Sequence, residues 1–376
     1  MRIAIDATSL LGDRTGVGTF TRHLVDGLAT SLEPDDDLRL FAVSWRGRSS
    51  LTSEAPRRST VSNRRFPARL ARMCWTRFPV PSARWFAGEI DLVHSPNFVV
   101  PPGGRGRGGN RVREVVTIHD LTCLHYPEMC TPDTLAYPRL IRAALRRGAS
   151  VHAVSRFVAD EVLEAFDLTT DRVVVVPNGV DLPTRPSDPK AGRRIAGVEQ
   201  YVLALGTIEP RKDLPLLVRA FDQIASAHPS LHLVVAGPDG WGVHAFDEAV
   251  HASPHHARIR RLGWLPDGDR RALLAGATVL AFPSRYEGFG LPPLEAMAEG
   301  TPVVATAAGA VPQVVGDAAL LVPVGDHDAL AAALTTVIDD PAQADLLRRA
   351  GLVQASAFPW TTTVAGIRGL YHSLLA

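Results

Sequence analysis

Two glutamates flank a glycine turn in the C-terminal half of the sequence. Glu287 and Glu295 stand eight positions apart in RYEGFGLPPLEAMAEG (285–300), with Gly-Phe-Gly and a proline pair between them. The prolines suit the first turn of a helix, where a missing N–H is harmless. Glu295 then lies about one turn inside that helix and Glu287 lies before it. Such a pair could be a catalytic dyad, a metal site, a ligand clamp or a solvated surface.

Two cations follow a separate apolar run. In LGTIEPRKDLPLLVRAF (205–221), Arg211 and Lys212 stand at the start of a helical pattern. Two positive side chains beside a helix N-terminus form a strong anion site. The sequence contains only two lysines, so a cation placed by chance would usually be an arginine. The alternative interpretation is a solvated basic turn.

A histidine ends a β-branched run in TIHDLTCLHYPE (117–128). Ligands of open α/β sheets bind beyond the carboxyl ends of strands, which makes His119 a candidate binding or proton-transfer group. A lone histidine is more often structural, so both interpretations stay open.

Two further turns could bring backbone N–H groups to a ligand. Gly16 and Gly18 precede a helical pattern in DRTGVGTFTRHL (13–24), which suits contact with a phosphate or sugar. A tight connection without a ligand explains these glycines equally well. The turn at Leu265, in GWLPDGDRRALLAGA (263–277), could hydrogen-bond the edge of a nucleobase, although alone it is only a loop.

An α/β scaffold is needed to position these residues. Short aliphatic runs alternate with longer helical patterns, and many runs are apolar on both faces, which is typical of buried parallel strands. The alternation predicts βαβ units. The expected strands are 2–6, 38–44, 92–95, 114–120, 150–155, 172–179, 201–206, 231–237, 259–264, 278–284, 302–306 and 319–324.

The strands form two series separated by a segment rich in proline, glycine and charge. We predict a Rossmann-like domain over 1–180, a linker over 181–199 and a second Rossmann-like domain over 200–358. Residues 359–376 have a helical period after a proline and are predicted to form a closing helix packed back on the first domain. The length of 376 residues is sufficient for two cores.

Composition excludes several classes of protein. Apolar residues make up 46% and charged residues 21%, as in soluble globular proteins, and a net charge of +1 gives no general attraction to nucleic acid. Three cysteines without a CxxC motif argue against a disulfide framework or zinc site. No apolar run is long enough to span a bilayer, and Asp6 interrupts the first one, which argues against a secretory signal. We therefore expect a cytoplasmic protein.

The stretch EGFGLPPLE resembles the E-x7-E motif of family 4 glycosyltransferases, which are retaining enzymes of GT-B fold. The resemblance covers nearly the whole chain and follows the family order. The similar segments are the glycine turn at 16–18, IHD at 118–120, VSRF at 154–157, VPNGVD at 176–181, GTIEPRK at 206–212, AGP at 236–238 and EAMAEGTPVVAT at 295–306. The fold it implies has two parallel sheets that face a central cleft. The resemblance also implies that the domain over 1–180 binds the acceptor and the domain over 200–358 binds the nucleotide sugar.

The resemblance implies a role for each matching residue. Glu295 would bind the ribose hydroxyls of a nucleotide sugar, and Glu287 would hold hydroxyls of the donor sugar. Lys212, with Arg211, would bind the donor phosphates, and His119 would lie by the reacting carbon. The other predicted donor-binding positions are Gly16, Gly18, Asn178, Thr207, Leu265, Gly288, Phe289, Gly290 and Leu291.

The phosphate loop departs from the commonest family pattern. Many members carry arginine and glycine where this chain has Thr207 and Asp213, and Arg211 is predicted to supply the missing charge. The form GTIEPRK is similar to a subgroup rich in mannosyltransferases of polysaccharide assembly, which favours GDP-mannose as donor and a glycan or lipid-linked acceptor. A UDP-hexose donor, a sugar-nucleotide epimerase of the same fold and a non-catalytic sugar-nucleotide sensor are the alternatives.

The predicted chemistry requires neither a cofactor nor a metal. Negative charge grows on the leaving diphosphate, and Arg211, Lys212 and a helix N-terminus can neutralise it. The D-x-D spacing at 35–37, a metal-binding motif in some glycosyltransferases, is interpreted as a solvated loop. In the front-face mechanism usually proposed for this fold, the leaving phosphate oxygen accepts the acceptor proton. His119 is then a positioning group more than a base.

A basic and aromatic segment over 46–84 stands outside these motifs. It carries ten arginines and one acid, Glu54, with Trp75 and Phe78 interleaved. Such a segment can dock on the anionic inner face of a membrane or bind a lipid-diphosphate acceptor. A surface loop is the alternative interpretation. The expected partners are therefore a nucleotide sugar, its acceptor and anionic lipid, without nucleic acid.

Overall fold

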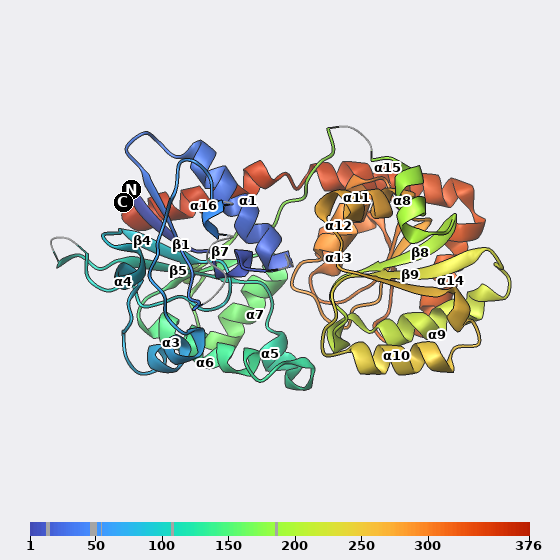
Figure 1. Cartoon of the computed structure of the whole chain (residues 1–376), viewed down its shortest axis with the longest axis horizontal. Coiled ribbons are helices and arrows are strands. Elements are labelled where there is room, and N and C mark those ends of the chain that lie inside the picture. Colours follow the sequence, from blue (N-terminus) through green and yellow to red (C-terminus); the bar gives the residue numbers. More distant parts are fainter. Residues whose placement is uncertain (13–15, 46–50, 54, 107–108, 185–186) are drawn as a thin grey trace. The chain divides into compact units, whose positions relative to one another are not determined.

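The computed structural model describes residues 1–12, 16–45, 51–53, 55–106, 109–184 and 187–376. The chain divides into two compact units, shown in the colours of the sequence in Figure 1. Unit 1 comprises Met1–Gly179 and Trp360–Ala376, and unit 2 comprises Val180–Pro359. Each unit contains a parallel sheet with helices, so the prediction of two Rossmann-like domains is confirmed.

Unit 1 is built on a seven-stranded sheet in the order β3-β2-β1-β4-β5-β6-β7, and all its pairings are parallel. Its strands are β1 (Arg2–Asp6), β2 (Asp37–Phe41), β3 (Thr60–Val61), β4 (Leu92–Ser95), β5 (Arg113–Ile118), β6 (Ser150–Ala153) and β7 (Val173–Val175). Its helices include α1 (Gly16–Ser31), α3 (Ala68–Trp75), α4 (Ala83–Ala87), α5 (Thr122–His125), α6 (Tyr137–Arg146), α7 (Arg156–Phe166) and α16 (Trp360–Leu375).

Unit 2 is built on a six-stranded parallel sheet in the order β10-β9-β8-β11-β12-β13. Its strands are β8 (Gln200–Leu205), β9 (Leu231–Ala236), β10 (Ile259–Gly263), β11 (Val279–Phe282), β12 (Val303–Thr306) and β13 (Leu320–Val322). Its helices include α8 (Pro189–Ala196), α9 (Leu214–Ala225), α10 (Val243–Ala252), α11 (Asp267–Gly276), α12 (Leu291–Ala298), α13 (Val311–Val315), α14 (His327–Asp339) and α15 (Pro341–Ser356).

All twelve predicted strands are present, because buried parallel strands are apolar on both faces. Strands β11 and β12 are fully buried along their length, and Val202 and Ala204 of β8 join one core with α9 and α14. The prediction missed β3, which has only two residues and forms by pairing with β2. Two residues are too few to show an alternating pattern.

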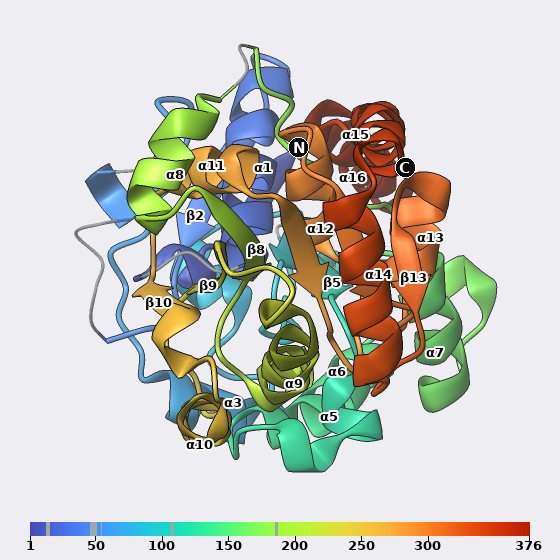
Figure 2. The same cartoon turned by 90° about the vertical axis from the view of Figure 1, so that its right-hand side faces the viewer.

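The segment predicted as a linker over 181–199 is not a linker throughout, because it contains helix α8. This helix packs against α11, and Figure 2 shows the two side by side. The contact is close: a Cβ added to Gly192 would lie 1.9 Å from the carbonyl oxygen of Ala272. Asp188 caps the helix at its N-terminus. Eight residues give little periodicity, and the helix is buried only through its partner in the tertiary structure.

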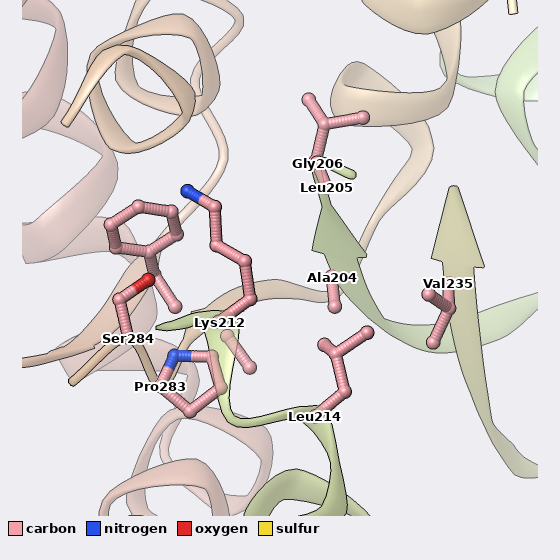
Figure 3. A pocket seen from close by; sticks show the side chains of 10 residues that line it. Ala204, Leu205, Gly206, Lys212, Leu214, Val235, Pro283 and Ser284 are labelled. Carbon is pink, nitrogen blue, oxygen red and sulfur yellow. The ribbon is translucent and has the colours of Figure 1, made fainter. Parts of the chain in front are cut away.

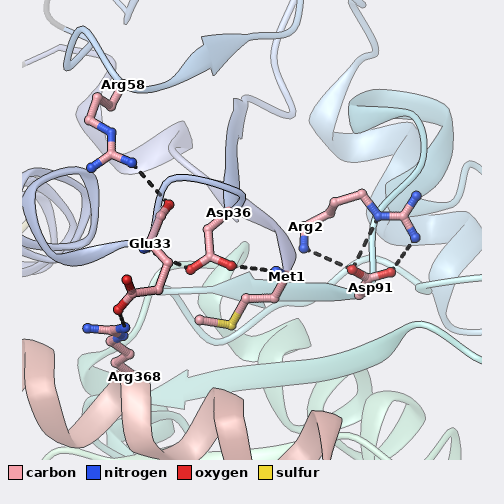
Figure 4. Close-up of polar contacts among 7 residues, drawn as sticks. All are labelled: Met1, Arg2, Glu33, Asp36, Arg58, Asp91 and Arg368. Atoms are coloured by element: carbon pink, nitrogen blue, oxygen red, sulfur yellow. Dashed lines mark hydrogen bonds and ion pairs between the residues drawn. The ribbon is translucent and has the colours of Figure 1, made fainter.

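The closing helix α16 packs on α1 of unit 1, as predicted. Trp360 stacks on His23 with ring centroids 4.3 Å apart. Further along the helix, Arg368 donates to Glu33 at 2.9 Å, in the loop that follows α1 (Figure 4). The last residues of the chain therefore complete the first unit.

A buried polar network ties α16 to the sheet of unit 1. Tyr371 Oη lies 2.5 Å from Nδ1 of His94, and Nε2 of His94 lies 2.7 Å from Oγ1 of Thr117. The same Thr117 oxygen lies 2.9 Å from Nδ1 of His152, whose Nε2 lies 2.9 Å from the carbonyl oxygen of Val176. The four side chains are fully buried.

When both imidazoles are neutral, one end of this network sets the direction of its hydrogen bonds. The Val176 carbonyl can only accept, so His152 donates through Nε2 and accepts at Nδ1 from the Thr117 hydroxyl. Thr117 then accepts from Nε2 of His94, which accepts at Nδ1 from Tyr371. These directions hold for neutral imidazoles, the form that full burial favours in both histidines. Burial is the main cause that lowers the pKa of His152 to about 4 and the pKa of His94 well below its ordinary value.

The network predicts a pH-dependent stability. Between about pH 4 and pH 6.5 the unfolded chain binds a proton at His152 that the folded chain does not. The free energy of unfolding should therefore fall as the pH falls through this window, by up to about 3 kcal/mol from His152. Urea unfolding at pH 7.5 and pH 5 measures this. His152→Gln keeps a donor for Val176 without titrating and should reduce the slope; an unchanged slope in that variant would contradict the explanation.

Candidate active site

The loop that follows β8 carries both predicted cations. It forms a 3-10 turn over Pro210–Lys212, and α9 begins at Leu214. Asp213 between them has a φ of 45°, in the left-handed region that few residues other than glycine adopt. The family that the sequence resembles often has glycine at this position, and aspartate is among the few side chains that tolerate this conformation.

Arg211 and Lys212 converge on the first glutamate of the pair. Lys212 Nζ lies 2.6 Å from Oε1 of Glu287, and Arg211 Nη1 lies 2.5 Å from Oε2. Arg211 also donates to Glu209 at 2.6 Å and to the carbonyl oxygen of Tyr286 at 3.0 Å. Charges therefore alternate through Glu209, Arg211, Glu287 and Lys212, and each buried ion has an opposite neighbour.

The two cations keep Glu287 ionised although its residue is only 6% exposed. Burial acts to raise the pKa of its carboxyl group, but attraction by Arg211 and by Lys212 outweighs burial and lowers the pKa to about 2. A carboxylate of this kind accepts hydrogen bonds and does not donate a proton near neutral pH. This charge argues against Glu287 as a proton donor in a catalytic dyad and fits a binding role.

Backbone geometry holds Glu287 in its turn. Its carbonyl oxygen accepts from the N–H of Ala310 at 2.8 Å, and a Cβ on Gly309 would lie 2.2 Å from that oxygen. Gly290 has a φ of 110° and precedes the first residue of α12, Leu291. Gly288 lies in the same turn, and Phe289 is buried against Phe358. The glycines thus allow a sharp entry into the helix.

A small pocket lies beside the loop that carries Arg211 and Lys212, which we call the cation loop. It is at the carboxyl ends of β8, β9 and β11. In Figure 3 the Lys212 side chain extends between Ser284 and the end of β8. Its ammonium also lies 4.6 Å from the centroid of the Phe282 ring, within cation–π range. The pocket is lined by Ala204, Leu205, Gly206, Lys212, Leu214, Val235, Ala281, Phe282, Pro283 and Ser284.

The second glutamate has a separate cationic partner. Glu295 lies inside α12, as predicted, and Arg270 of α11 contacts both its carboxylate oxygens, at 3.0 and 3.2 Å. Burial, with smaller contributions from Asp181 and Asp267, raises the pKa of Glu295, and Arg270 opposes the rise. The two glutamates of the motif are therefore held by different arginines.

Thr207 and Leu265 occupy the turns after β8 and β10, and both are half-buried. They share unit 2 with the cation loop, Glu287 and Glu295. The four remaining predicted positions, His119, Gly16, Gly18 and Asn178, belong to unit 1.

In unit 1, His119 directly follows β5, as predicted. Its Nε2 donates to the carbonyl oxygen of Pro96 at 2.7 Å, and its ring packs edge-on against Phe20 with centroids 5.3 Å apart. Burial lowers the pKa of His119. The imidazole is therefore neutral near pH 7 and has a fixed tautomer, which suits positioning better than proton donation.

The glycine positions of unit 1 differ from the expected turn. Helix α1 begins at Gly16, so Gly16 and Gly18 lie within its first turn, while residues 13–15 of the predicted turn lie outside the described residues. Their N–H groups belong to the helix N-terminus, which still suits an anion. Asn178, after β7, is buried, and its Oδ1 has no hydrogen-bond partner among the described residues.

The D-x-D spacing at 35–37 is part of a structural junction. Asp36 accepts from the amino group of Met1 at 2.5 Å (Figure 4), and Asp37 accepts from Arg39 at 2.7 Å. Nearby, Arg2 pairs with Asp91. Two of the three carboxylates therefore have structural partners. Among the described residues, no three His, Cys, Asp or Glu side chains are grouped so as to hold a metal ion.

Some arginines of the basic segment over 46–84 make structural contacts within unit 1. Arg58 donates to the carbonyl oxygens of Leu32 and Glu33, both at 3.0 Å, and Arg84 pairs with Glu89. Residues 46–50 and 54, which include Arg46, Arg48 and Glu54, lie outside the described residues. The remaining segment exposes large apolar side chains, with Met73 71% and Phe78 60% exposed. Exposed arginines stand among them, namely Arg57, Arg64, Arg65, Arg69 and Arg77.

Sequence comparison assigns both units to known families. Residues 14–183 match the family described as Glycosyltransferase Family 4, and residues 190–352 match Glycosyl transferases group 1. The O-antigen chain mannosyltransferase B of Escherichia coli is 30% identical over 364 residues, which cover 92% of this chain and 93% of that one. The chain belongs to glycosyltransferase family 4.

Other proteins are similar to this glycosyltransferase in sequence or in structure. The MMP alpha-(1->4)-mannosyltransferase of Mycolicibacterium hassiacum is 34% identical over 59% of this chain and 54% of its own. Sucrose-phosphate synthase from Thermosynechococcus elongatus superposes with a TM-score of 0.78, 22% identity and coverage of 100% and 99% of the two chains. Anabaena HepE, solved in complex with UDP and glucose, superposes with a TM-score of 0.74 and 20% identity, and the superposition covers 99% of each chain. These structures show the GT-B fold.

Two site residues of the glycosyltransferase escaped the sequence analysis. Glu209 and Arg270 each pair with a predicted residue, namely Arg211 and Glu295. Glu209 stands inside the motif GTIEPRK, so its proximity to Arg211 was available as a signal. Arg270 follows a loop and lies in an amphipathic helix, and nothing in its sequence distinguishes it from the adjacent Arg271.

The geometry predicts that Lys212 contributes to turnover by the glycosyltransferase. Lys212→Ala should lower kcat by roughly 100- to 1,000-fold, the effect of losing one preorganised donor to developing negative charge. Steady-state kinetics with a nucleotide sugar measure this. Lys190→Ala is the matched control, because Lys190 is the other lysine of the sequence and is exposed on α8. Near-normal turnover in Lys212→Ala would contradict the phosphate role.

Proposed function

We propose that this glycosyltransferase moves mannose from GDP-mannose to a glycan or lipid-linked acceptor, with retention of configuration. The observation that carries the proposal is the cluster of Lys212, Arg211 and Glu287 at the carboxyl end of the unit 2 sheet. It combines cations for a diphosphate with an ionised acceptor for sugar hydroxyls. Two relatives that are mannosyltransferases support mannose as the transferred sugar.

The two cations have different parts in this proposal. Arg211 is held by Glu209, Glu287 and the Tyr286 carbonyl, so its charge acts from a fixed place. Lys212 has a flexible stem and three donors, and its ammonium can serve a phosphate oxygen while it stays near Glu287. Their combined charge stabilises the leaving diphosphate, so we expect no metal to be required.

In the proposed mechanism the bond to the diphosphate breaks through an oxocarbenium-like state. The released phosphate oxygen takes the proton of the acceptor hydroxyl, which then attacks the same face of the sugar. No protein base is required. His119, neutral and fixed by Pro96, positions the sugar, and Glu287 holds its hydroxyls.

Nucleotide recognition is assigned to the other end of the motif. Glu295 accepts hydrogen bonds from the ribose hydroxyls, and the turn at Leu265 contacts the base. The first turn of α1, with Gly16 and Gly18, offers N–H groups to the phosphates or the acceptor.

A UDP-hexose donor is the second candidate. The observation that favours it is the structural likeness to HepE, which was solved with UDP and glucose. Arg211 and Lys212 could serve the diphosphate of either donor, so the charges at the site do not choose between the two bases.

A panel of nucleotide sugars tests the proposed function. We expect slow hydrolysis of GDP-mannose above that of UDP-glucose, UDP-galactose and UDP-N-acetylglucosamine, with activity retained in EDTA. Product analysis by nuclear magnetic resonance gives the anomer released and shows any epimerisation. Preference for a UDP-hexose would overturn the mannose donor, epimerised product would overturn transfer, and loss of activity in EDTA would overturn metal independence. Cleavage of no sugar would favour a sensor.

We further propose that the segment 64–85 contacts anionic lipid in order to reach a lipid-linked acceptor. Leu70, Met73 and Phe78 are exposed large apolar side chains, and arginines surround them. Arg64 lies over the Trp85 ring at 5.2 Å, which places a cation beside another exposed aromatic. This combination suits the interface of a membrane. In the described part of the chain, no helix has the length and apolarity to cross a membrane.

Vesicle sedimentation tests this contact. The protein should bind phosphatidylglycerol vesicles at low salt and release at high salt, while phosphatidylcholine vesicles bind weakly. Met73→Glu should weaken binding, because it places a charge in the apolar surface. Val353→Glu on α15 is the matched control, since Met73 and Val353 are both 71% exposed. Equal binding of both variants would contradict the assignment of this surface as the lipid contact. No binding of the wild-type protein at low salt would contradict any contact with anionic lipid.

A further inference from the structure

Helices α11 and α12 of unit 2 are joined by two ion pairs. Arg270 contacts Glu295, and the adjacent Arg271 donates through Nε to Glu299 at 2.6 Å. The pairs differ in where they lie on α12. Glu295 is inside the helix that begins at the Glu287 turn, whereas Glu299 is at its C-terminal end.

The contact between Arg270 and Glu295 leaves acceptor capacity on the carboxylate. A single nitrogen, Nη1 of Arg270, reaches both oxygens of Glu295, at 3.0 and 3.2 Å. The other terminal nitrogen, Nη2, lies 3.4 Å from Asp267. A carboxylate has about four lone-pair sites, so this head-on contact leaves sites on both oxygens. Two neighbouring hydroxyls of a sugar could occupy them together.

The surroundings of the Glu295 carboxylate make a cationic partner necessary. Its side chain is 14% exposed, and the carboxylates of Asp181 and Asp267 act on it. Burial and both aspartates favour the protonated form, and Arg270 is the cation that opposes them. Without Arg270 the carboxyl group would take up a proton at higher pH and lose acceptor capacity.

We propose that Arg270 is a positioning residue for the nucleotide: it holds the Glu295 carboxylate ionised and oriented toward the ribose diol. The inference rests on the proposed function, because it takes the ligand of Glu295 to be a ribose. It adds a residue from α11 to the nucleotide site. Arg271, whose partner Glu299 is almost fully buried at 3% side-chain exposure, has a purely structural part.

Calorimetric binding of GDP and 2′,3′-dideoxy-GDP at pH 6 and pH 8 tests the inference without an acceptor. The wild-type protein should prefer GDP by roughly ten-fold or more, because charge-assisted hydrogen bonds to the diol are lost in the analogue. Glu295→Gln should lose most of this preference at both pH values. UDP and its dideoxy analogue replace the probes if GDP does not bind.

Arg270→Gln should lose more of the preference at pH 6 than at pH 8, because Glu295 then protonates in a higher pH range. Arg270→Lys, which restores the charge, should recover the preference at pH 6. Arg271→Gln should match the wild-type protein at both pH values, although it lowers the melting temperature. A purely structural role for Arg270 would change stability and leave the pH dependence of the preference unmoved.

The outcomes separate the two hypotheses. If Glu295→Gln loses the preference and Arg270→Gln behaves like the wild-type protein at both pH values, the role of Arg270 is overturned and the ribose site stands. If Glu295→Gln retains the full preference, the ribose assignment fails and the Arg270 inference falls with it. If neither nucleotide binds the wild-type protein, the proposed function itself is contradicted.

Discussion

The buried carboxylate of Glu287 is the constraint on which the site of unit 2 depends. A charge that is almost removed from water is tolerated only beside opposite charges and hydrogen-bond donors. Arg211 and Lys212 meet that demand, and in doing so they fix the loop after β8 against the turn before α12. The same contacts concentrate positive charge at the carboxyl ends of the strands, where a diphosphate can be bound.

Two clusters, one in each unit, bury polar groups in opposite ways. In unit 1, the network of Tyr371, His94, Thr117 and His152 is neutral, and every donor has an acceptor in one direction. Such a network specifies a single arrangement of helix and sheet without leaving charge in the core. In the cluster of unit 2 that contains Glu209, Arg211, Glu287 and Lys212, the groups are ions that alternate in sign.

The phosphate loop shows how a departure from the family pattern is accommodated. Asp213 adopts the left-handed conformation for which glycine is common, so the turn keeps its shape. Thr207 stands where many members have a cation. Arg211 does add charge nearby, but its guanidinium is bound by Glu209 and Glu287, so the charge is shared within the protein. The loop therefore depends on Lys212 for a cation whose flexible side chain can be reoriented.

Much of this protein was determined by the sequence alone. Buried parallel strands are apolar throughout, so twelve strands, two domains and the turns that end them could be predicted. Their place in those turns made Lys212 and the paired glutamates candidates for a site. Tertiary structure decided which charges meet. Arg270 and Glu295 are 25 residues apart, and Lys212 and Glu287 are 75 apart, distances at which no sequence period operates. Helix α8 could not be predicted from the sequence for the same reason, since its burial depends on a surface that α11 supplies. Local patterns record which face of an element is buried, and only the folded chain shows what it is buried against.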